Sequence, residues 1–161
     1  MTLGRGEGIR VQALGDSLDR LRAAAAPLRE VPGWATIDLD RAQTALSSTL
    51  GRPLSVSEAA DDLLGASARH LRLADGQEVV LLEPSTEGRL AAALARHGEG
   101  IQVLYLLVGA DGLRLARDAG FALTDRRPGP FGSERLILGG PRWGPFLILA
   151  GRDSSARGLP R

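Results

Sequence analysis

The order of the predicted secondary structure restricts the fold of this sequence most, because a strand, a helix and three further strands occur twice in the same order. The first set spans residues 33–84 and the second spans residues 100–151. An amphipathic helix is predicted at 85–98, between the two sets. The sequence therefore predicts an α+β protein made of two similar modules joined by a helix.

The glycine-rich opening of the second module also occurs near the start of the chain. Gly98-Glu99-Gly100-Ile101 opens the second module, and Gly6-Glu7-Gly8-Ile9 opens a predicted strand at 8–14 that a helix follows. Residues 1–32 are therefore expected to form a strand-helix extension that resembles an incomplete module. Its strand would extend a sheet edge or pair with a second subunit, which makes a homodimer one expectation.

The elements of the two modules follow from hydrophobic spacing and from the positions of glycine and proline. The turn Ala74-Asp75-Gly76 indicates a β-hairpin, and the Gly/Pro-rich residues 127–133 indicate a loop. The tail 152–161 is predicted to be disordered. The predicted strands cover residues 34–39, 68–73, 78–83, 101–108, 121–126, 134–139 and 145–150, with a short extended segment around 54–56, and the predicted helices cover 41–50 and 110–119. Residues 58–65 are expected to form a loop or a turn of helix.

Composition limits the partners of the protein. A chain of 161 residues with 43% hydrophobic content is sufficient for one domain of ordinary size. The net charge is +1, with 20 basic and 19 acidic residues interspersed, so neither nucleic acid nor a membrane is expected as a partner. The chain has no cysteine, which excludes disulfides and thiolate sites. Its first residues lack the apolar core of a signal peptide, and a cytoplasmic location is expected.

Short segments in both modules resemble a known family. They lie at the first strand-helix junction, around the hairpin, at the start of the second module and in the last strand: Ile37-Asp38-Leu39-Asp40-Arg41-Ala42, Leu71-Arg72-Leu73-Ala74-Asp75-Gly76, Val79-Val80-Leu81-Leu82-Glu83-Pro84, Arg96-His97-Gly98-Glu99-Gly100-Ile101 and Gly144-Pro145-Phe146-Leu147-Ile148-Leu149. In this order, over residues 33–151, the chain resembles the vicinal oxygen chelate superfamily, which includes glyoxalase I, methylmalonyl-CoA epimerase, extradiol dioxygenases and bleomycin-resistance proteins. The epimerase-type branch is the most similar. The resemblance implies two βαβββ modules that form a curved mixed sheet around a cleft.

The metal-binding positions that this resemblance implies are occupied by residues that cannot bind a metal. Enzymes of the family hold one divalent metal with four side chains, mostly His, Glu or Gln, on the first and last strands of each module. The matching positions here are Gly33 or Trp34, Val80, Val103 and Ile148. None of these side chains is a metal ligand. Neither a metal nor another cofactor is therefore expected.

The expected cleft has an apolar lining with a few polar and aromatic groups. Tyr105 shares strand parity with Val103, so that it is expected to face the cleft or to pack as a core residue. Trp34 begins the first strand and is expected to fill the space at the first ligand position, and Phe131 lies in a loop able to close over a ligand. The candidate ligand-binding residues are Val80, Leu82, Val103, Tyr105, Trp143, Phe146, Ile148, His70 and Arg72.

Two further groups of charged residues have both a structural and a functional interpretation. His97 ends the predicted linker helix, where a cation favours the helix dipole. Arg126 and Arg127 precede the Gly/Pro-rich loop, where they would either grip a carboxylate or phosphate or remain solvated.

Three functions agree with these observations. The leading hypothesis is a metal-independent small-molecule-binding protein that resembles the bleomycin-resistance type and takes an organic ligand. The alternative is an epimerase, isomerase or lyase acting on a small carbonyl or acyl-CoA substrate, with Glu78, or Tyr105 with His70, as the base, and Arg72 or Tyr105 as the oxyanion stabiliser. The third is an interaction module in which the cleft has collapsed.

Overall fold

A single sheet of eight strands organises the computed structural model, which describes residues 5–85 and 87–151. The strand order is β2-β3-β4-β1-β5-β8-β7-β6, so that each module contributes four neighbouring strands. The strands are β1 (Arg29–Ala35), β2 (Ser55–Asp61), β3 (Ala66–Arg72), β4 (Glu78–Pro84), β5 (Gly100–Val108), β6 (Arg127–Gly129), β7 (Gly132–Leu136) and β8 (Phe146–Gly151). The helices are α1 (Arg5–Ala25), α2 (Leu39–Leu50), α3 (Arg89–His97) and α4 (Gly112–Asp118).

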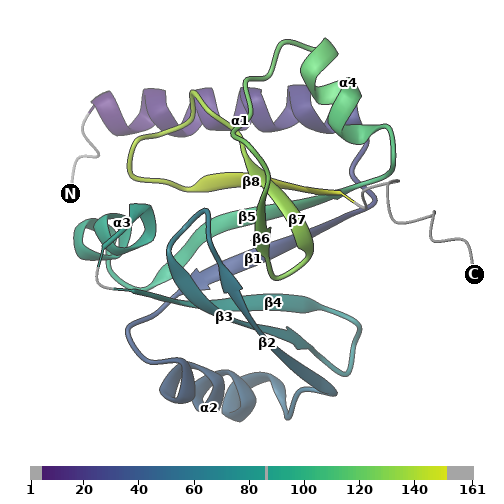
Figure 1. Cartoon of the computed structure of the whole chain (residues 1–161). Helices are drawn as coiled ribbons and strands as arrows, with labels where there is room; N and C mark the ends of the chain where they lie inside the picture. Colours follow the sequence, from purple (N-terminus) through teal and green to yellow (C-terminus); the bar gives the residue numbers. More distant parts are fainter. Residues whose placement is uncertain (1–4, 86, 152–161) are drawn as a thin grey trace, which may run out of the picture.

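The sheet is mixed and strongly curved (Figure 1). The central strands β1 and β5 are antiparallel, whereas β1 pairs with β4 and β5 pairs with β8 in parallel. The two edges of the sheet approach each other. The backbone N–H of Asp62, directly after β2, donates to the carbonyl of Pro128 on β6 at 3.1 Å. The prediction of an α+β fold with two βαβββ modules curved around a cleft is confirmed.

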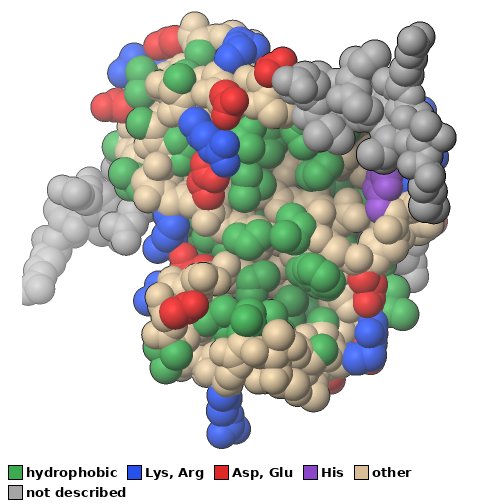
Figure 2. Space-filling view, turned by 180° about the vertical axis from the view of Figure 1, so that it is seen from behind, with side chains coloured by type: hydrophobic (Ala, Val, Ile, Leu, Met, Phe, Trp, Pro, Cys, Tyr) green, Lys and Arg blue, Asp and Glu red, His purple; other side chains and the backbone are tan. Residues whose placement is uncertain are grey.

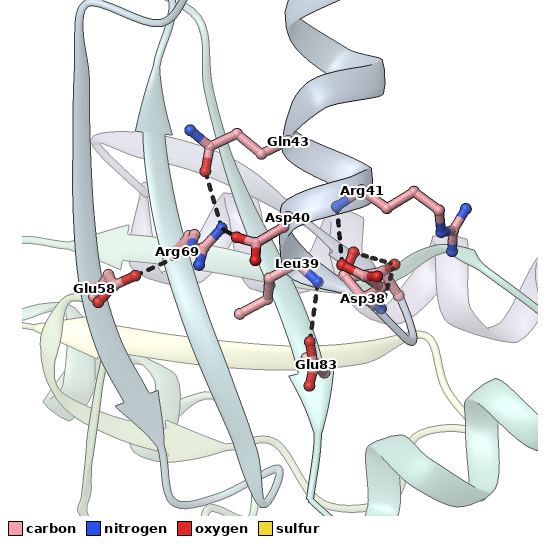
Figure 3. A network of polar contacts seen from close by, with 9 residues as sticks. Asp38, Leu39, Asp40, Arg41, Gln43, Glu58, Arg69 and Glu83 are labelled. Atoms are coloured by element: carbon pink, nitrogen blue, oxygen red, sulfur yellow. Dashed lines mark hydrogen bonds and ion pairs between the residues drawn. The ribbon is translucent and has the colours of Figure 1, made fainter.

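Helix α2 is fixed to the outer face of the first module by polar contacts at its N-terminus (Figure 3). Asp38 caps the helix, with its carboxylate accepting from the backbone N–H of Arg41 at 2.9 Å. The carboxylate of Glu83 on β4 accepts from the backbone N–H of Leu39 at 2.9 Å. Arg69 on β3 adds ion pairs to acidic side chains of α2 and β2. The helix therefore begins at a position set by the sheet.

Two hydrophobic clusters lie on opposite faces of the sheet. The inner cluster fills the concave face and draws on both modules: Val31, Ala35, Leu64, Ala66, Ala68, Val80, Leu82, Leu90, Ala93, Val103, Tyr105, Leu136, Phe146 and Ile148. The outer cluster lies between the second module and helices α1 and α4: Leu21, Ala25, Leu106, Val108, Ala116, Ile137, Leu147 and Leu149. Alternate residues of β5 and β8 enter the two clusters, as the twofold period of a strand requires.

The predicted N-terminal strand at 8–14 is wrong, because residues 5–25 form the single helix α1. Leu14, Leu18, Leu21 and Ala25 all pack into or against the outer cluster. Their spacing places them on one face of a helix. A short glycine motif cannot make a strand without a neighbouring strand to pair with. The proposed strand-mediated dimer therefore loses its structural basis.

Two other predicted elements are misplaced. The first strand lies at 29–35 and not at 34–39, so that the first module begins before residue 33. Residues 121–126 form no strand; the segment contributes only an isolated bridge between Leu123 and Ile137. The predicted loop 127–133 instead contains β6 and the start of β7. Proline at 128 is tolerated because β6 is an edge strand.

The tail 152–161, predicted to be disordered, lies outside the described residues. Within the part of the chain that the structure describes, none of the helices combines the length and apolar character that crossing a membrane requires. The hairpin turn at Ala74-Asp75-Gly76 is confirmed, since Leu73 and Gln77 are hydrogen-bonded across it and Gly76 has a φ of +85°.

Candidate functional site

The four positions of the implied metal site lie on the concave face but carry no metal ligand. Gly33 stands opposite Val80 on one side and Val103 on the other. Val80, Val103 and Ile148 are completely buried in the inner cluster. Among the described residues, no group of three or more His, Cys, Asp or Glu side chains is arranged to hold a metal. The residues present therefore do not fit a metal at this position.

The space at the first of these positions is already occupied. A Cβ atom on Gly33 would lie 2.8 Å from Val103 Cβ and 3.0 Å from Leu82 Cδ1. Trp34 does not fill this space, because it is 40% exposed and pairs with Ile101. Hydrophobic side chains gather in the middle of the face that Figure 2 shows. The expectation that Trp34 replaces the first ligand is therefore wrong.

Tyr105 is the polar centre of the concave face. Its side chain is completely buried, and its hydroxyl donates to Asp61 Oδ2 at 2.7 Å. Asp61 Oδ1 accepts from the backbone N–H of Leu64 at 3.1 Å, which fixes the carboxyl at the end of β2. Burial, together with the charge of Asp61, raises the pKa of Tyr105 well above 10. Tyr105 is therefore a neutral hydrogen-bond donor.

A second buried carboxyl, that of Glu134 on β7, meets Asp61. Burial, the charge of Asp61 and a hydrogen bond between the two carboxyls raise the pKa of Glu134 to about 8. Burial also raises the pKa of Asp61. Two adjacent buried carboxyls retain a proton between them at neutral pH, since both cannot ionise at low cost. Glu134 Oε2 is buried without a hydrogen-bond partner among the described residues.

Phe131, at the tip of the β6–β7 hairpin, lies between the polar groups of the concave face. Its ring makes edge-to-face contacts with Tyr105, at a centroid distance of 5.2 Å, and with His70, at 4.8 Å. Its backbone N–H donates to Glu134 Oε1 at 2.9 Å. The predicted closing loop is thus a hairpin, and its tip places the Phe131 ring between His70 and Tyr105.

On the other side of Phe131, His70 pairs with a carboxylate. His70 Nε2 lies 3.1 Å from Glu78 Oε1, and Glu78 also pairs with Arg29 at 2.8 Å and with Arg72 at 3.3 Å. Burial lowers the pKa of His70 below 6.5, although Glu78 opposes this change. The histidine is therefore neutral at pH 7. When its Nε2 proton is directed at Glu78, Nδ1 carries the free lone pair.

The concave face is not covered over β2. In the antiparallel pairing of β2 and β3, Ala59 stands opposite Ala68 and Ser57 stands opposite His70. Opposed residues of this kind point to the same face. Ala68 is buried in the inner cluster, whereas Ser57 and Ala59 are exposed. Solvent therefore reaches the concave face beside His70, at the side of the sheet where the hairpin tip enters.

The structure brings most of the predicted ligand-binding residues together. Those in the inner cluster are Val80, Leu82, Val103, Tyr105, Phe146 and Ile148. His70 lies beside Phe131, and Arg72 reaches the site only through Glu78. Trp143 instead contacts the guanidinium groups of Arg96 and Arg142, at 5.7 and 4.7 Å. His97 is the last residue of α3, as predicted.

The two buried acids, Asp61 and Glu134, were not among the predicted site residues. Glu134 has the same strand parity as the buried Leu136, so the twofold alternation within the predicted strand 134–139 could have identified it as inward-facing. Asp61 gave no such signal, because β2 is exposed along its length except at this residue.

A surface pocket of about 620 Å³ lies near the junction of the two sheet edges. Its lining contains the basic Arg89 and Arg127 and the acidic Asp62 and Asp125, together with Leu63, Gly65 and Thr124. It does not include Tyr105, His70 or Phe131 and is therefore distinct from the concave face. Arg127 of the predicted anion-binding pair faces this pocket, where the two acidic residues balance the two arginines.

We expect Gly129→Ala to destabilise the hairpin through Glu134. A Cβ atom on Gly129 would lie 1.9 Å from Glu134 Oε2, so that the buried carboxyl or the hairpin must move. The expected loss is about 2 kcal/mol of unfolding free energy, measured by urea denaturation. Gly140→Ala is the matched control, because no heavy atom lies within 4 Å of its Cβ position. Equal stability of the two variants would contradict the close packing of Glu134 against Gly129.

Comparisons with known proteins agree with the geometry of the fold. No protein-family model matches the sequence, and no curated protein matches it either. Among solved structures, methylmalonyl-CoA epimerase from Mycobacterium tuberculosis is similar, with a TM-score of 0.64 and 24% identity over 78% of this chain and 87% of that one. A hypothetical protein from Bacillus halodurans has a TM-score of 0.61 and 18% identity over 80% of this chain and 96% of that one. A mutant of 4-hydroxymandelate synthase from Streptomyces coelicolor has a TM-score of 0.55 and 19% identity, over 83% of this chain and half of that one.

Proposed function

We propose that this chain, which has the fold of the vicinal oxygen chelate superfamily, is a small-molecule-binding protein that works without a metal. Its ligand carries a flat ring that takes the place of Phe131 between His70 and Tyr105. The insertion of the Phe131 ring between these two side chains carries the proposal. An aromatic ring held by edge-to-face contacts marks a position where another ring is also favoured.

Three features support this proposal. The fold's metal positions hold Gly33, Val80, Val103 and Ile148, which cannot ligate a metal but provide an apolar floor. Polar groups stand on both sides of the ring position, with the Tyr105–Asp61 pair on one side and the His70–Glu78 pair on the other. The inner face of β2 is exposed beside it, which gives a ligand a route of approach.

The proposal is tested by thermal denaturation of the purified protein with a panel of small aromatic compounds. Compounds that bind only the folded chain raise its melting temperature. The same panel is applied to Tyr105→Leu, which keeps an apolar side chain but removes the ring and hydroxyl. A ring-bearing compound that stabilises the native chain and not Tyr105→Leu supports the proposal. The absence of stabilisation across the panel, with native chain and Phe131→Ala alike, contradicts it.

An enzyme of the epimerase, isomerase or lyase type is the second candidate, because His70 and Glu78 form an oriented base. Glu78 is already engaged by Arg29 and Arg72, so that His70 is the better proton acceptor of the two. The similarity to methylmalonyl-CoA epimerase makes small carbonyl compounds and acyl-CoA thioesters the natural substrates to test. Removal of a proton beside a carbonyl would use His70 Nδ1 as the base.

For this second candidate we expect solvent deuterium exchange into an acyl-CoA thioester that is abolished by His70→Gln. Glutamine keeps a polar side chain of similar length but has no basic nitrogen. Glu58→Gln is the control, because Glu58 lies on the exposed β2 and pairs with Arg69. Mass spectrometry of the recovered thioester measures the exchange. Exchange that survives His70→Gln excludes His70 as the base, and exchange that is absent across a panel of thioesters excludes this reaction.

A further inference from the structure

Phe131 contacts the concave face with both its backbone N–H and its ring. Its backbone nitrogen, Cα, Cβ and ring together have the skeleton of 2-phenylethylamine. The nitrogen donates to Glu134 Oε1 at 2.9 Å, and the ring contacts His70 and Tyr105. An N–H donor and an aryl ring separated by two carbons are therefore held together by groups of this face.

The carboxyl groups of Glu134, which binds the backbone nitrogen of Phe131, and of Asp61 lack a basic partner among the described residues. Among the described residues, no arginine or histidine pairs with Asp61 or Glu134, and Glu134 Oε2 has no hydrogen-bond partner. A peptide N–H supplies one donor without charge, whereas an ammonium group supplies three donors with a positive charge. Buried carboxylates are stabilised when a cation is paired with them and hydrogen-bonded to them. The site therefore favours an amine over a neutral or anionic group.

The β6–β7 hairpin, whose tip places the Phe131 ring between His70 and Tyr105, is small and lies at the sheet edge. Strand β6 has three residues, and its partners are β7 and the end of β2. Gly132, directly after Phe131, has a φ of +100°, a conformation that glycine adopts without strain. The ring of Phe131 is partly exposed beside the uncovered inner face of β2. Movement of this hairpin tip would release the ring position without unfolding the inner cluster.

We propose that the concave face binds an arylethylamine, with its ring in the place of Phe131 between His70 and Tyr105 and its ammonium group on the carboxyls of Asp61 and Glu134. This assignment rests on the proposed function and adds the chemical class of the ligand. Phe131 then acts as an internal competitor that holds the site closed until an amine replaces it. Removing its ring vacates the ring position and strengthens ligand binding, although the ammonium group must still displace the backbone N–H of residue 131 from Glu134 Oε1.

The test compares three compounds of similar size by isothermal titration calorimetry: 2-phenylethylamine, 2-phenylethanol and phenylacetate. In Phe131→Ala we expect 2-phenylethylamine to bind about tenfold more tightly than 2-phenylethanol, since one charge-assisted hydrogen bond accounts for such a ratio. Phenylacetate is expected to bind most weakly. In the triple variant Phe131→Ala with Asp61→Asn and Glu134→Gln, which removes both carboxyls, the preference for the amine disappears while binding of the alcohol is retained.

Two controls decide between the outcomes. Phe121→Ala makes the same change in the outer cluster and is expected to show no preference for the amine. Phe131→Leu, which keeps apolar bulk at the hairpin tip, and the native chain receive the same three compounds, so that a poorly folded Phe131→Ala does not leave the question open. Equal binding of amine and alcohol overturns the arylethylamine assignment and leaves the proposed function standing. Absence of binding by all three compounds in every variant overturns both.

Discussion

Tyr105→Ala is expected to destabilise the protein by about 4 kcal/mol, a typical cost for removing a fully buried aromatic side chain. Tyr105 is completely buried in the inner cluster and contacts the ring of Phe131. Its hydroxyl is also the donor to Asp61 Oδ2. The substitution therefore opens a cavity and leaves a buried carboxyl oxygen without this donor. Equilibrium unfolding in urea, with linear extrapolation to water, measures the loss.

Tyr105→Phe separates the two contributions, because it removes the hydroxyl and keeps the ring. We expect a loss of about 1–2 kcal/mol from the unsatisfied Asp61 carboxyl. In the background of Asp61→Asn the same substitution should cost less, since the partner is no longer an ionisable group. Identical losses for Tyr105→Phe and Tyr105→Ala would contradict the packing role of the ring. A loss below about 0.5 kcal/mol for Tyr105→Phe would contradict the buried hydrogen bond.

The repeated order of strands and helices predicted two similar α+β modules, whereas their arrangement as one curved sheet around a cleft was implied by the family resemblance. Period-two alternation predicted that Val103 and Tyr105 share the inner face, and both lie there in the structure. The N-terminal segment was misread because a strand exists only through its partner, and no strand of the sheet was available to residues 8–14. Hydrophobic spacing from Leu14 to Ala25 was the better guide, because a helix is defined by contacts within itself.

The candidate site was only partly predictable, and the reason is geometric. Val80 and Ile148 could be placed because their strand positions follow from the fold that the resemblance implies. The pairing of Asp61 with Glu134 could not, because it depends on how far the two edges of the sheet curve toward each other. The two edges meet where the backbone N–H of Asp62 donates to the carbonyl of Pro128. The placement of Phe131 between His70 and Tyr105 depends on the same closure.

The stability of the protein should fall as the pH rises from about 5 to about 8, because Glu134 is buried as a neutral acid. Its folded pKa of about 8 lies above the ordinary value of 4.5. The unfolded chain releases this proton near pH 4.5, whereas the folded chain holds it until about pH 8. The stabilisation that the protonated Glu134 contributes is therefore fully present below its unfolded pKa and is lost as the pH rises through its folded pKa. Across the interval between these two pKa values, the loss of unfolding free energy is at most about 5 kcal/mol.

The cleanest window for this measurement is pH 6.5 to 8.5. His70, which reaches the pair only through Phe131, has a lowered pKa and acts in the opposite direction, with stability lost as the pH falls below 6.5. The raised pKa of Asp61 acts in the same direction as that of Glu134, and Tyr105 stays neutral throughout. In this window the native chain is expected to lose about 2 kcal/mol of unfolding free energy.

Glu134→Gln is the decisive control, because an amide of the same shape cannot ionise. Its carbonyl oxygen can still accept from the backbone N–H of Phe131, and its NH2 group can donate to Asp61. We therefore expect the unfolding free energy of this variant to change by less than about 0.5 kcal/mol between pH 6.5 and 8.5. A native chain that is equally stable at both ends of the window would show that Glu134 is ionised in the folded state. An ionised and buried Glu134 would need a positively charged partner, and the ammonium group of the proposed amine would supply that charge.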